Sequence, residues 1–202
     1  DTSQKYNAEV VSGPVLCKFE DTGIREVIKR IYFHRTRFKT GSIIENCASG
    51  NVLIDMKIFK EKPHLLFNKN FNLMGGGDTQ FFIEVKSFGF NILWCDEAIL
   101  HEFISRERSN LKNSLLRSFF AGNQFFYLKK ITNKNIFNLK HSSVLKTFLN
   151  IIVIIIRLIF YFLTLNKYKF IKNLSRISEK LGFIITALTG IEGRKYKKIF
   201  GE

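Results

Sequence analysis

The sequence is short of acidic residues and of cysteine. Asp and Glu together number 17 among 202 residues, against 32 Lys and Arg, which gives a formal net charge of +15. The three cysteines, Cys17, Cys47 and Cys95, are odd in number and form no CxxC pair. This fits a reducing compartment, with neither a disulfide framework nor a zinc site. The chain also opens without a signal peptide or an initiator Met, so we expect it to be a piece of a longer protein.

The basic excess is concentrated in the last part of the chain. Residues 129–202 carry 15 basic and 3 acidic side chains, whereas residues 1–128 carry 17 and 14. A chain of this length can hold one domain with a sizeable core plus an appendage. We therefore expect a domain of ordinary composition over residues 1–128 and a basic, hydrophobic helical tail over residues 129–202.

Strand and helix patterns alternate over the first 128 residues. The strand patterns occupy residues 8–16, broken by a Gly-Pro pair, residues 43–54, interrupted by Ser-Gly-Asn, and residues 91–95. The helical patterns occupy residues 22–38, 78–88 and 109–128. Alternation of this kind predicts an α/β layer structure. In the first helical pattern, the basic side chains form a solvated face or, alternatively, a phosphate-binding patch; they are Lys29, Arg30, Arg35 and Arg37.

Three consecutive glycines, residues 75–77, lead directly into Asp78. Apolar residues then follow at helical spacing, which predicts a helix that starts near Asp78 and buries one face; they are Phe81, Phe82, Val85 and Phe88. The partial positive charge of a helix N-terminus favours an ionised carboxylate, and glycines let a substrate approach the backbone closely. The alternative is that Asp78 is only an N-cap that follows a flexible loop.

In this order and at these separations, the segments resemble the C-terminal half of a family 2 glycosyltransferase with the GT-A fold. The segments that carry the resemblance are residues 8–15, 49–54, 67–71, 75–82, 89–98 and 102–108. Residues 114–122 are similar to the basic helix that follows in that family. The resemblance implies an incomplete GT-A-like α/β domain that lacks its N-terminal nucleotide-binding half.

The resemblance implies an inverting enzyme that transfers a sugar from a nucleotide-diphosphate donor to a cell-envelope glycan or lipid-linked acceptor. Asp78 matches the general base that removes the proton of the acceptor hydroxyl, and Gly77 stands where the family usually has Glu. Arg108 matches a basic position that neutralises the leaving diphosphate. The residues assigned to acceptor binding are Ser49, Gly50, Asn51, Gly76 and Gly77.

The resemblance also implies a divalent cation, Mg²⁺ or Mn²⁺. Glu102 matches a late position that approaches the metal and the diphosphate, and His101 is either a pocket residue or a second ligand. The family's Asp-x-Asp motif, which supplies hard carboxylate oxygens to such an ion, does not occur in this sequence. We therefore expect the segment alone to bind a nucleotide sugar poorly, and a non-catalytic membrane-associated remnant or scaffold is the alternative function.

Residues 147–165 form an apolar run that is long enough for one bilayer crossing, which takes roughly 20 residues. Arg157 within it would cost about 2.5 to 3.5 kcal/mol, which the many Ile, Leu and Phe residues could offset. Basic residues lie on both flanks, which favours a helix in the membrane interface or a re-entrant one over a crossing helix. A second apolar run, residues 181–191, is too short to span. Burial of both runs against the catalytic domain would explain their hydrophobicity, but it would not explain the density of Lys and Arg.

We expect the tail to attach to the anionic cytoplasmic face of the inner (plasma) membrane. A nucleic-acid partner would also attract a basic chain. However, the basic residues here surround aliphatic runs, and aromatic stacking platforms interleaved with Arg are not evident. We expect no nucleic-acid partner.

Overall fold

The computed structural model describes residues 2–20, 26–72, 75–132 and 136–190 and divides the chain into two compact units. The sheet unit comprises Asp1–Glu20, His34–Asn72 and Gly76–Ile104. The helical unit comprises Asp21–Phe33, Leu73–Gly75 and Ser105–Glu202. The expected boundary after residue 128 therefore falls inside a long helix of the helical unit rather than between the two units.

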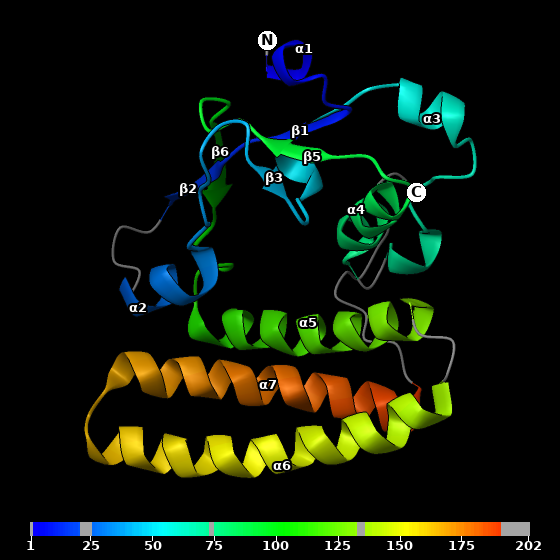
Figure 1. Ribbon diagram of the computed structural model, residues 1–202. Coiled ribbons are helices and arrows are strands. Elements are labelled where there is room, and N and C mark those ends of the chain that lie inside the picture. Colours follow the sequence, from blue (N-terminus) through cyan, green and yellow to red (C-terminus); the bar gives the residue numbers. More distant parts are fainter. Residues whose placement is uncertain (1, 21–25, 73–74, 133–135, 191–202) are drawn as a thin grey trace. The chain divides into compact units, whose positions relative to one another are not determined.

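The sheet unit is built on a four-stranded mixed sheet in the order β3-β5-β1-β4 (Figure 1). Strand β1 (Val10–Ser12) pairs in parallel with β5 (Ile92–Trp94) and antiparallel with β4 (Val52–Ile54). Strand β3 (Ile43–Ile44) completes the sheet by antiparallel pairing with β5. A second, two-stranded parallel sheet joins β2 (Val15–Phe19) to β6 (Leu100–Ile104). The predicted mixed α/β architecture is confirmed.

The two faces of the larger sheet bury different residues because successive strand residues point to opposite sides. On one side, the strand residues Val10 and Ile92 share a core with Phe81, Phe82 and other residues of α3 (Lys57–Glu61) and α4 (Gly77–Ser87). On the other side, the strand residues Val11 and Leu93 form a smaller cluster with Ala8, which follows α1 (Thr2–Tyr6). Short 3₁₀ turns at Ser49–Asn51 (η2) and Lys69–Phe71 (η3) complete the unit.

The predicted strand at residues 8–16 is two strands that belong to different sheets. The break is at Gly13 and Pro14, where the backbone leaves one sheet for the other. A Cβ atom at Gly13 would collide with the carbonyl oxygen of Ala98, so only glycine fits at this point. The Asn51 side chain holds the same place by donating to the carbonyl oxygens of Pro14, at 3.1 Å, and Ala98, at 2.7 Å.

The predicted helix at residues 22–38 is wrong beyond Phe33. Its described part is α2 (Glu26–Ile28) followed by a π-helical turn, η1 (Lys29–Phe33), and the chain from residue 34 is not helical. Residues 21–25 lie outside the described residues. Arg35 and Arg37 therefore belong to a non-helical segment of the sheet unit and not to a helix face.

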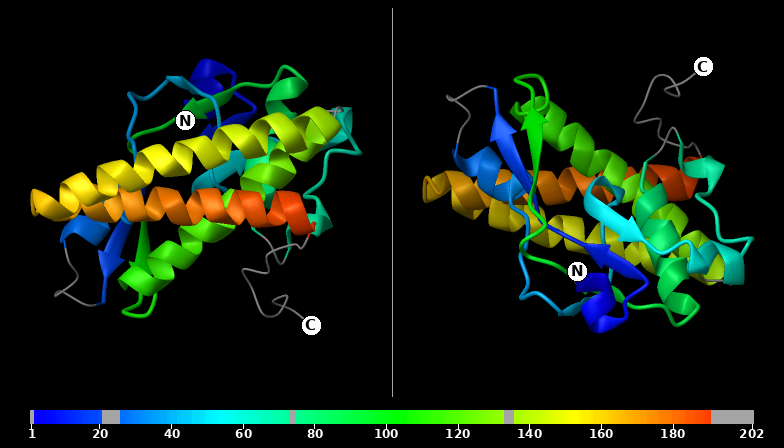
Figure 2. Two further views of the ribbon diagram at one scale, coloured as in Figure 1. Left: turned by 90° about the horizontal axis from the view of Figure 1, so that it is seen from below. Right: turned by 90° about the horizontal axis from the view of Figure 1, so that it is seen from above.

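The helical unit contains three long helices, α5 (Leu111–Thr132), α6 (Ile136–Leu163) and α7 (Lys167–Thr189). Helix α7 lies between the other two (Figures 1 and 2). The predicted helical character of the C-terminal region is confirmed. In the part of the chain that the structure describes, one helical stretch, Val144–Leu163, is long and apolar enough to cross a membrane.

Candidate functional site

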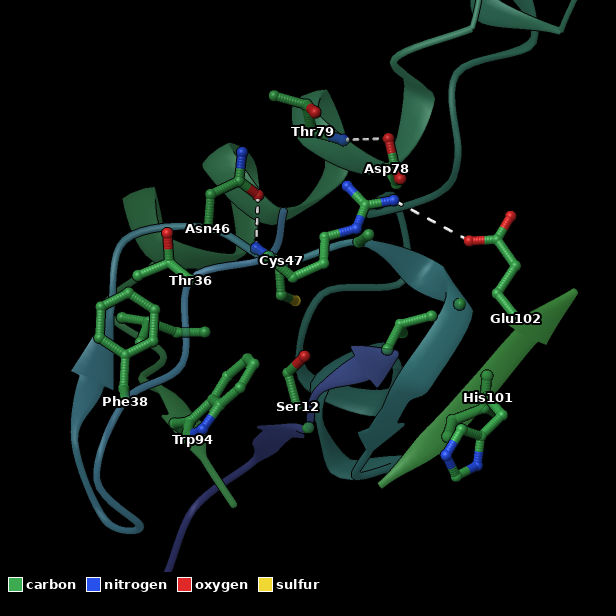
Figure 3. Close-up of a pocket in the computed structure, with 17 residues that line it drawn as sticks. Ser12, Thr36, Phe38, Asn46, Cys47, Asp78, Thr79, Trp94, His101 and Glu102 are labelled. Atoms are coloured by element: carbon green, nitrogen blue, oxygen red, sulfur yellow. Dashed lines mark hydrogen bonds and ion pairs between the residues drawn. The ribbon is translucent and has the colours of Figure 1, made fainter. Parts of the chain in front are cut away.

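A cavity of about 690 Å³ opens in the sheet unit beside the carboxyl ends of the parallel strands β1 and β5. This is the position at which open α/β sheets commonly bind ligands. Figure 3 shows its labelled lining residues. They come from separate segments of the chain: Ser12, Thr36, Phe38, Asn46, Cys47, Asp78, Thr79, Trp94, His101 and Glu102.

Asp78 reaches this cavity from the first turn of α4. Its Oδ1 accepts a hydrogen bond from the backbone N–H of Thr79 at 2.8 Å, which fixes the carboxylate against the helix start. The N-cap is Gly76 and not Asp78, so the N-cap alternative is wrong. Gly75 and Gly76 have φ angles of +77° and +87°, and this left-handed backbone explains why glycines precede the acid.

An aromatic pair forms a different part of the lining, apart from Asp78 and Glu102 (Figure 3). The rings of Phe38 and Trp94 meet edge to face, with their centroids 5.5 Å apart. Trp94 Nε1 donates to Asp96 at 3.1 Å, and Arg37 donates to both carboxylate oxygens of Asp96 at 2.8 Å. These hydrogen bonds, chiefly the one from Arg37, lower the pKa of Asp96. The indole is therefore held in place by an ionised partner.

Glu102 and His101 both line the cavity from β6, but their side chains leave the strand in different directions (Figure 3). Adjacent strand positions point to opposite faces, so the two do not converge on one point. Glu102 instead forms an ion pair with Arg35, with 3.9 Å between Oε2 and Nη2. Sequence reasoning missed Arg35 as a cavity residue because its place depends on the chain leaving the helix at Phe33.

In the described part of the chain, no ligand set matches the expected divalent cation. Within the described ranges, no three His, Cys, Asp or Glu side chains come together in a group that could hold a metal ion. Divalent cations of this type need several oxygen ligands, with water or substrate completing the shell. Asp78 and Glu102 line the same cavity, but two carboxylates do not amount to such a group.

Of the residues expected to bind the acceptor, one lines the cavity and the others do not. Gly50 lines the cavity, whereas Ser49, Gly76 and Gly77 are not among the lining residues. The Asn51 amide is occupied by the two backbone carbonyls described above. Arg108, the expected diphosphate ligand, is an exposed residue of the helical unit.

The Cys47 thiol is the cavity's other ionisable group of interest. Its pKa is raised to about 12, chiefly by burial; a hydrogen bond with Ser12 acts in the opposite direction, and the negative charge of Asp78 adds a smaller increase. Cys47 is therefore a protonated thiol at neutral pH and not a nucleophile. Sequence reasoning gave Cys47 no role in the site.

This coupling gives a test of the site's geometry that does not depend on activity. We expect Asp78→Asn to lower the pKa of Cys47, because the substitution removes a negative charge that disfavours the thiolate. Iodoacetamide should then modify Cys47 faster than in the wild-type chain at about pH 9, as measured by peptide mass spectrometry. Cys17 and Cys95 serve as internal references whose rates should not change. An unchanged rate at Cys47 would mean that the two side chains are not neighbours.

No protein-family model, no curated protein and no solved structure matches this chain.

Proposed function

We propose that the cavity binds the sugar acceptor of an inverting glycosyltransferase and that Asp78 is its general base. The observation that carries this proposal is a carboxylate fixed at the first turn of α4 that lines a cavity with an aromatic pair elsewhere in its wall. Sugar rings have apolar faces and polar edges. A cavity that combines the rings of Phe38 and Trp94 with carboxylates suits that mixture.

In the proposed reaction, Asp78 accepts the proton of the acceptor hydroxyl as its oxygen attacks the anomeric carbon of the donor. The bond between that carbon and the diphosphate oxygen breaks, and the diphosphate leaves with the electron pair. Negative charge therefore grows on the leaving group, where a cation stabilises the transition state. Arg35 lines this cavity, so its guanidinium is the proposed source of that positive charge.

The proposed donor is a nucleotide-diphosphate sugar, and the proposed acceptor is a cell-envelope glycan or a lipid-linked sugar. The GT-A-like fold and the need for Mg²⁺ or Mn²⁺ are part of the same proposal. They rest on the sequence resemblance, since the described residues offer no metal-ligand group. A non-catalytic membrane-associated module is the second candidate, because the exposed apolar helix α6 needs a partner whether or not the cavity is catalytic.

Acceptor binding can be measured through Trp94, which is the only tryptophan of the chain and lines the cavity. We expect candidate acceptor glycans to change its fluorescence in a saturable way. Gly50→Leu should weaken that binding about tenfold or more by filling the cavity. A Cβ at Gly50 meets no atom within 4 Å, so the fold should tolerate the substitution. If glycans bind and Gly50→Leu binds them equally well, the binding site lies elsewhere.

A further inference from the structure

Helix α6 leaves most of its apolar residues uncovered. It packs against α7 through one side, on which Thr147, Ile151 and Ile154 are buried. Only 11% of the apolar window Val144–Leu163 is buried. The exposed large apolar residues of α6 are Leu145, Phe148, Leu149, Ile152, Val153, Ile155, Ile156, Ile159, Phe160, Phe162 and Leu163.

Between Val144 and Leu163, the charged and amide side chains of α6 lie along one stripe. At about 100° of rotation per residue, Lys146, Asn150 and Arg157 fall within one narrow sector that borders the side buried against α7. The exposed apolar residues fill the remaining circumference, roughly half of the helix. A helix with a broad apolar face and a polar stripe along one edge is the type that lies in a membrane interface.

The charged residues of helix α7 disfavour a membrane-crossing orientation of α6. It runs side by side with α6 (Figures 1 and 2) and exposes Lys167, Lys169, Lys172 and Arg176. Lys169 also lies over the ring of Tyr161 on α6, with Nζ 5.3 Å from its centroid. If α6 crossed a bilayer in this packing, α7 would carry its charges into the hydrocarbon region, where each one is costly. If α6 lay flat, those side chains could reach the headgroups.

We propose that α6 lies in the plane of an anionic membrane surface, with its apolar face at the acyl boundary and the basic residues of α6 and α7 at the headgroups. The positive charge of this region favours anionic lipid as the partner. Residues 144–190 contain 7 Lys and Arg and 1 Glu, so a second copy of this surface would be repelled, whereas anionic lipid would be attracted. This inference does not depend on the proposed sugar transfer, since a non-catalytic chain would bind the membrane equally well.

Sedimentation with lipid vesicles tests the surface. The full chain should bind vesicles of mixed phosphatidylcholine and phosphatidylglycerol. It should bind vesicles of pure phosphatidylcholine more weakly, and high salt should weaken its binding to the mixed vesicles. Ile156→Glu should lower the partition coefficient about tenfold or more. Leu66→Glu is the matched control, because Leu66 is 64% exposed and Ile156 63% exposed, and Leu66 belongs to the sheet unit.

Quenching by brominated lipids tests the orientation. Leu145→Trp, Ile156→Trp and Leu163→Trp place a probe at three points along one side of α6, and the wild-type chain gives the Trp94 baseline. The first and last positions are about 27 Å apart along the helix axis. We expect all three probes at one shallow depth. A deep probe at 156 with shallow probes at both ends would show a spanning helix and overturn the proposal.

Two other results would also overturn it. One is a failure of the vesicle test: either the wild-type chain does not bind anionic vesicles, or Leu66→Glu lowers the binding as much as Ile156→Glu does. The other is a chain that forms a dimer without lipid, fails to bind vesicles and becomes a monomer with Ile156→Glu, because the apolar face would then be an interface between copies.

Discussion

Replacing Asp78 by Asn should reduce sugar transfer by about 10²- to 10⁴-fold, the usual contribution of a positioned general base. The substitution keeps the shape of the side chain, and the amide oxygen can still accept the hydrogen bond from the Thr79 N–H that holds the carboxylate at 2.8 Å. What is lost is the capacity to accept a proton. The loss should therefore be in kcat, while binding of the acceptor to the cavity changes little.

The measurement is release of nucleoside diphosphate from labelled donor sugars in the presence of glycan and lipid-linked acceptors. Asp55→Asn is a matched control, because Asp55 Oδ1 also accepts a backbone N–H near a helix start, from Lys57 at 2.8 Å, and Asp55 is not a lining residue. If both variants lose activity equally, the effect of Asp78 is structural. If the wild-type chain transfers no sugar from any donor, the non-catalytic membrane module is the better explanation.

The start of α4 could be predicted from the sequence because its determinants are local. Glycines at residues 75 and 76 adopt a left-handed backbone, and Phe81, Phe82 and Val85 are buried at the expected helical spacing. Phe88 was expected on the same buried face, but it is the C-cap and is 38% exposed. The pattern therefore identified the helix and its buried face and extended that face one residue too far.

The path of the chain after Phe33 could not be predicted in the same way. The apolar spacing of residues 22–38 continues as far as Phe38 and is typical of a helix. In the fold, however, Arg37 pairs with Asp96, 59 residues away, and the ring of Phe38 meets Trp94. These long-range contacts outweigh local helix propensity, and nothing in a single sequence indicates them.

The lining of the cavity could also be predicted from the sequence only in part. Asp78, Gly50, His101 and Glu102 were expected at one site and all of them line it. The resemblance placed them there, since no local pattern indicates that β1 and β5 pair in parallel. Ser12 and Cys47 were not expected, because Ser12 is placed by the pairing of β1 with β5 and Cys47 follows β3, which is placed by its own pairing with β5. The Gly-Pro break after Ser12 was the available signal that a strand ends there.

The composition of the chain also did not indicate that α5 belongs to the same unit as α6 and α7. Charge placed a boundary after residue 128, but α5 continues to Thr132 and packs along α7. The signal that was present is a spacing of four between small residues on α5, namely Ser114, Ser118 and Gly122, which typically permits close helix contact. Ser118 meets Ser175 of α7 with 2.7 Å between the hydroxyl oxygens, and Ser178 donates to the carbonyl oxygen of Leu115 at 2.8 Å.

This contact between α5 and α7 should be the most sensitive packing site of the helical unit. A Cβ at Gly122 would collide with the carbonyl oxygen of Glu179, and a Cβ at Gly182 would collide with that of Phe119. In both cases the obstacle is helix backbone, which cannot rotate away as a side chain can. We expect Gly122→Ala and Gly182→Ala each to lower the free energy of unfolding by about 1 to 3 kcal/mol, the usual cost of overpacking.

The direction of the change in stability separates close helix packing from helix propensity. Alanine is the better helix former by about 1 kcal/mol, so without the close contact Gly122→Ala would stabilise the chain. Ala121→Gly, on the exposed neighbouring residue of the same helix, measures that propensity alone and should destabilise. Chemical unfolding followed by circular dichroism at the helical band compares the variants. If Gly122→Ala stabilised the chain by as much as Ala121→Gly destabilised it, the two helices would not be in contact at this point. A double variant that loses less than the sum of the two single glycine variants would show that both report on one contact, because the first added methyl group already forces the helices apart.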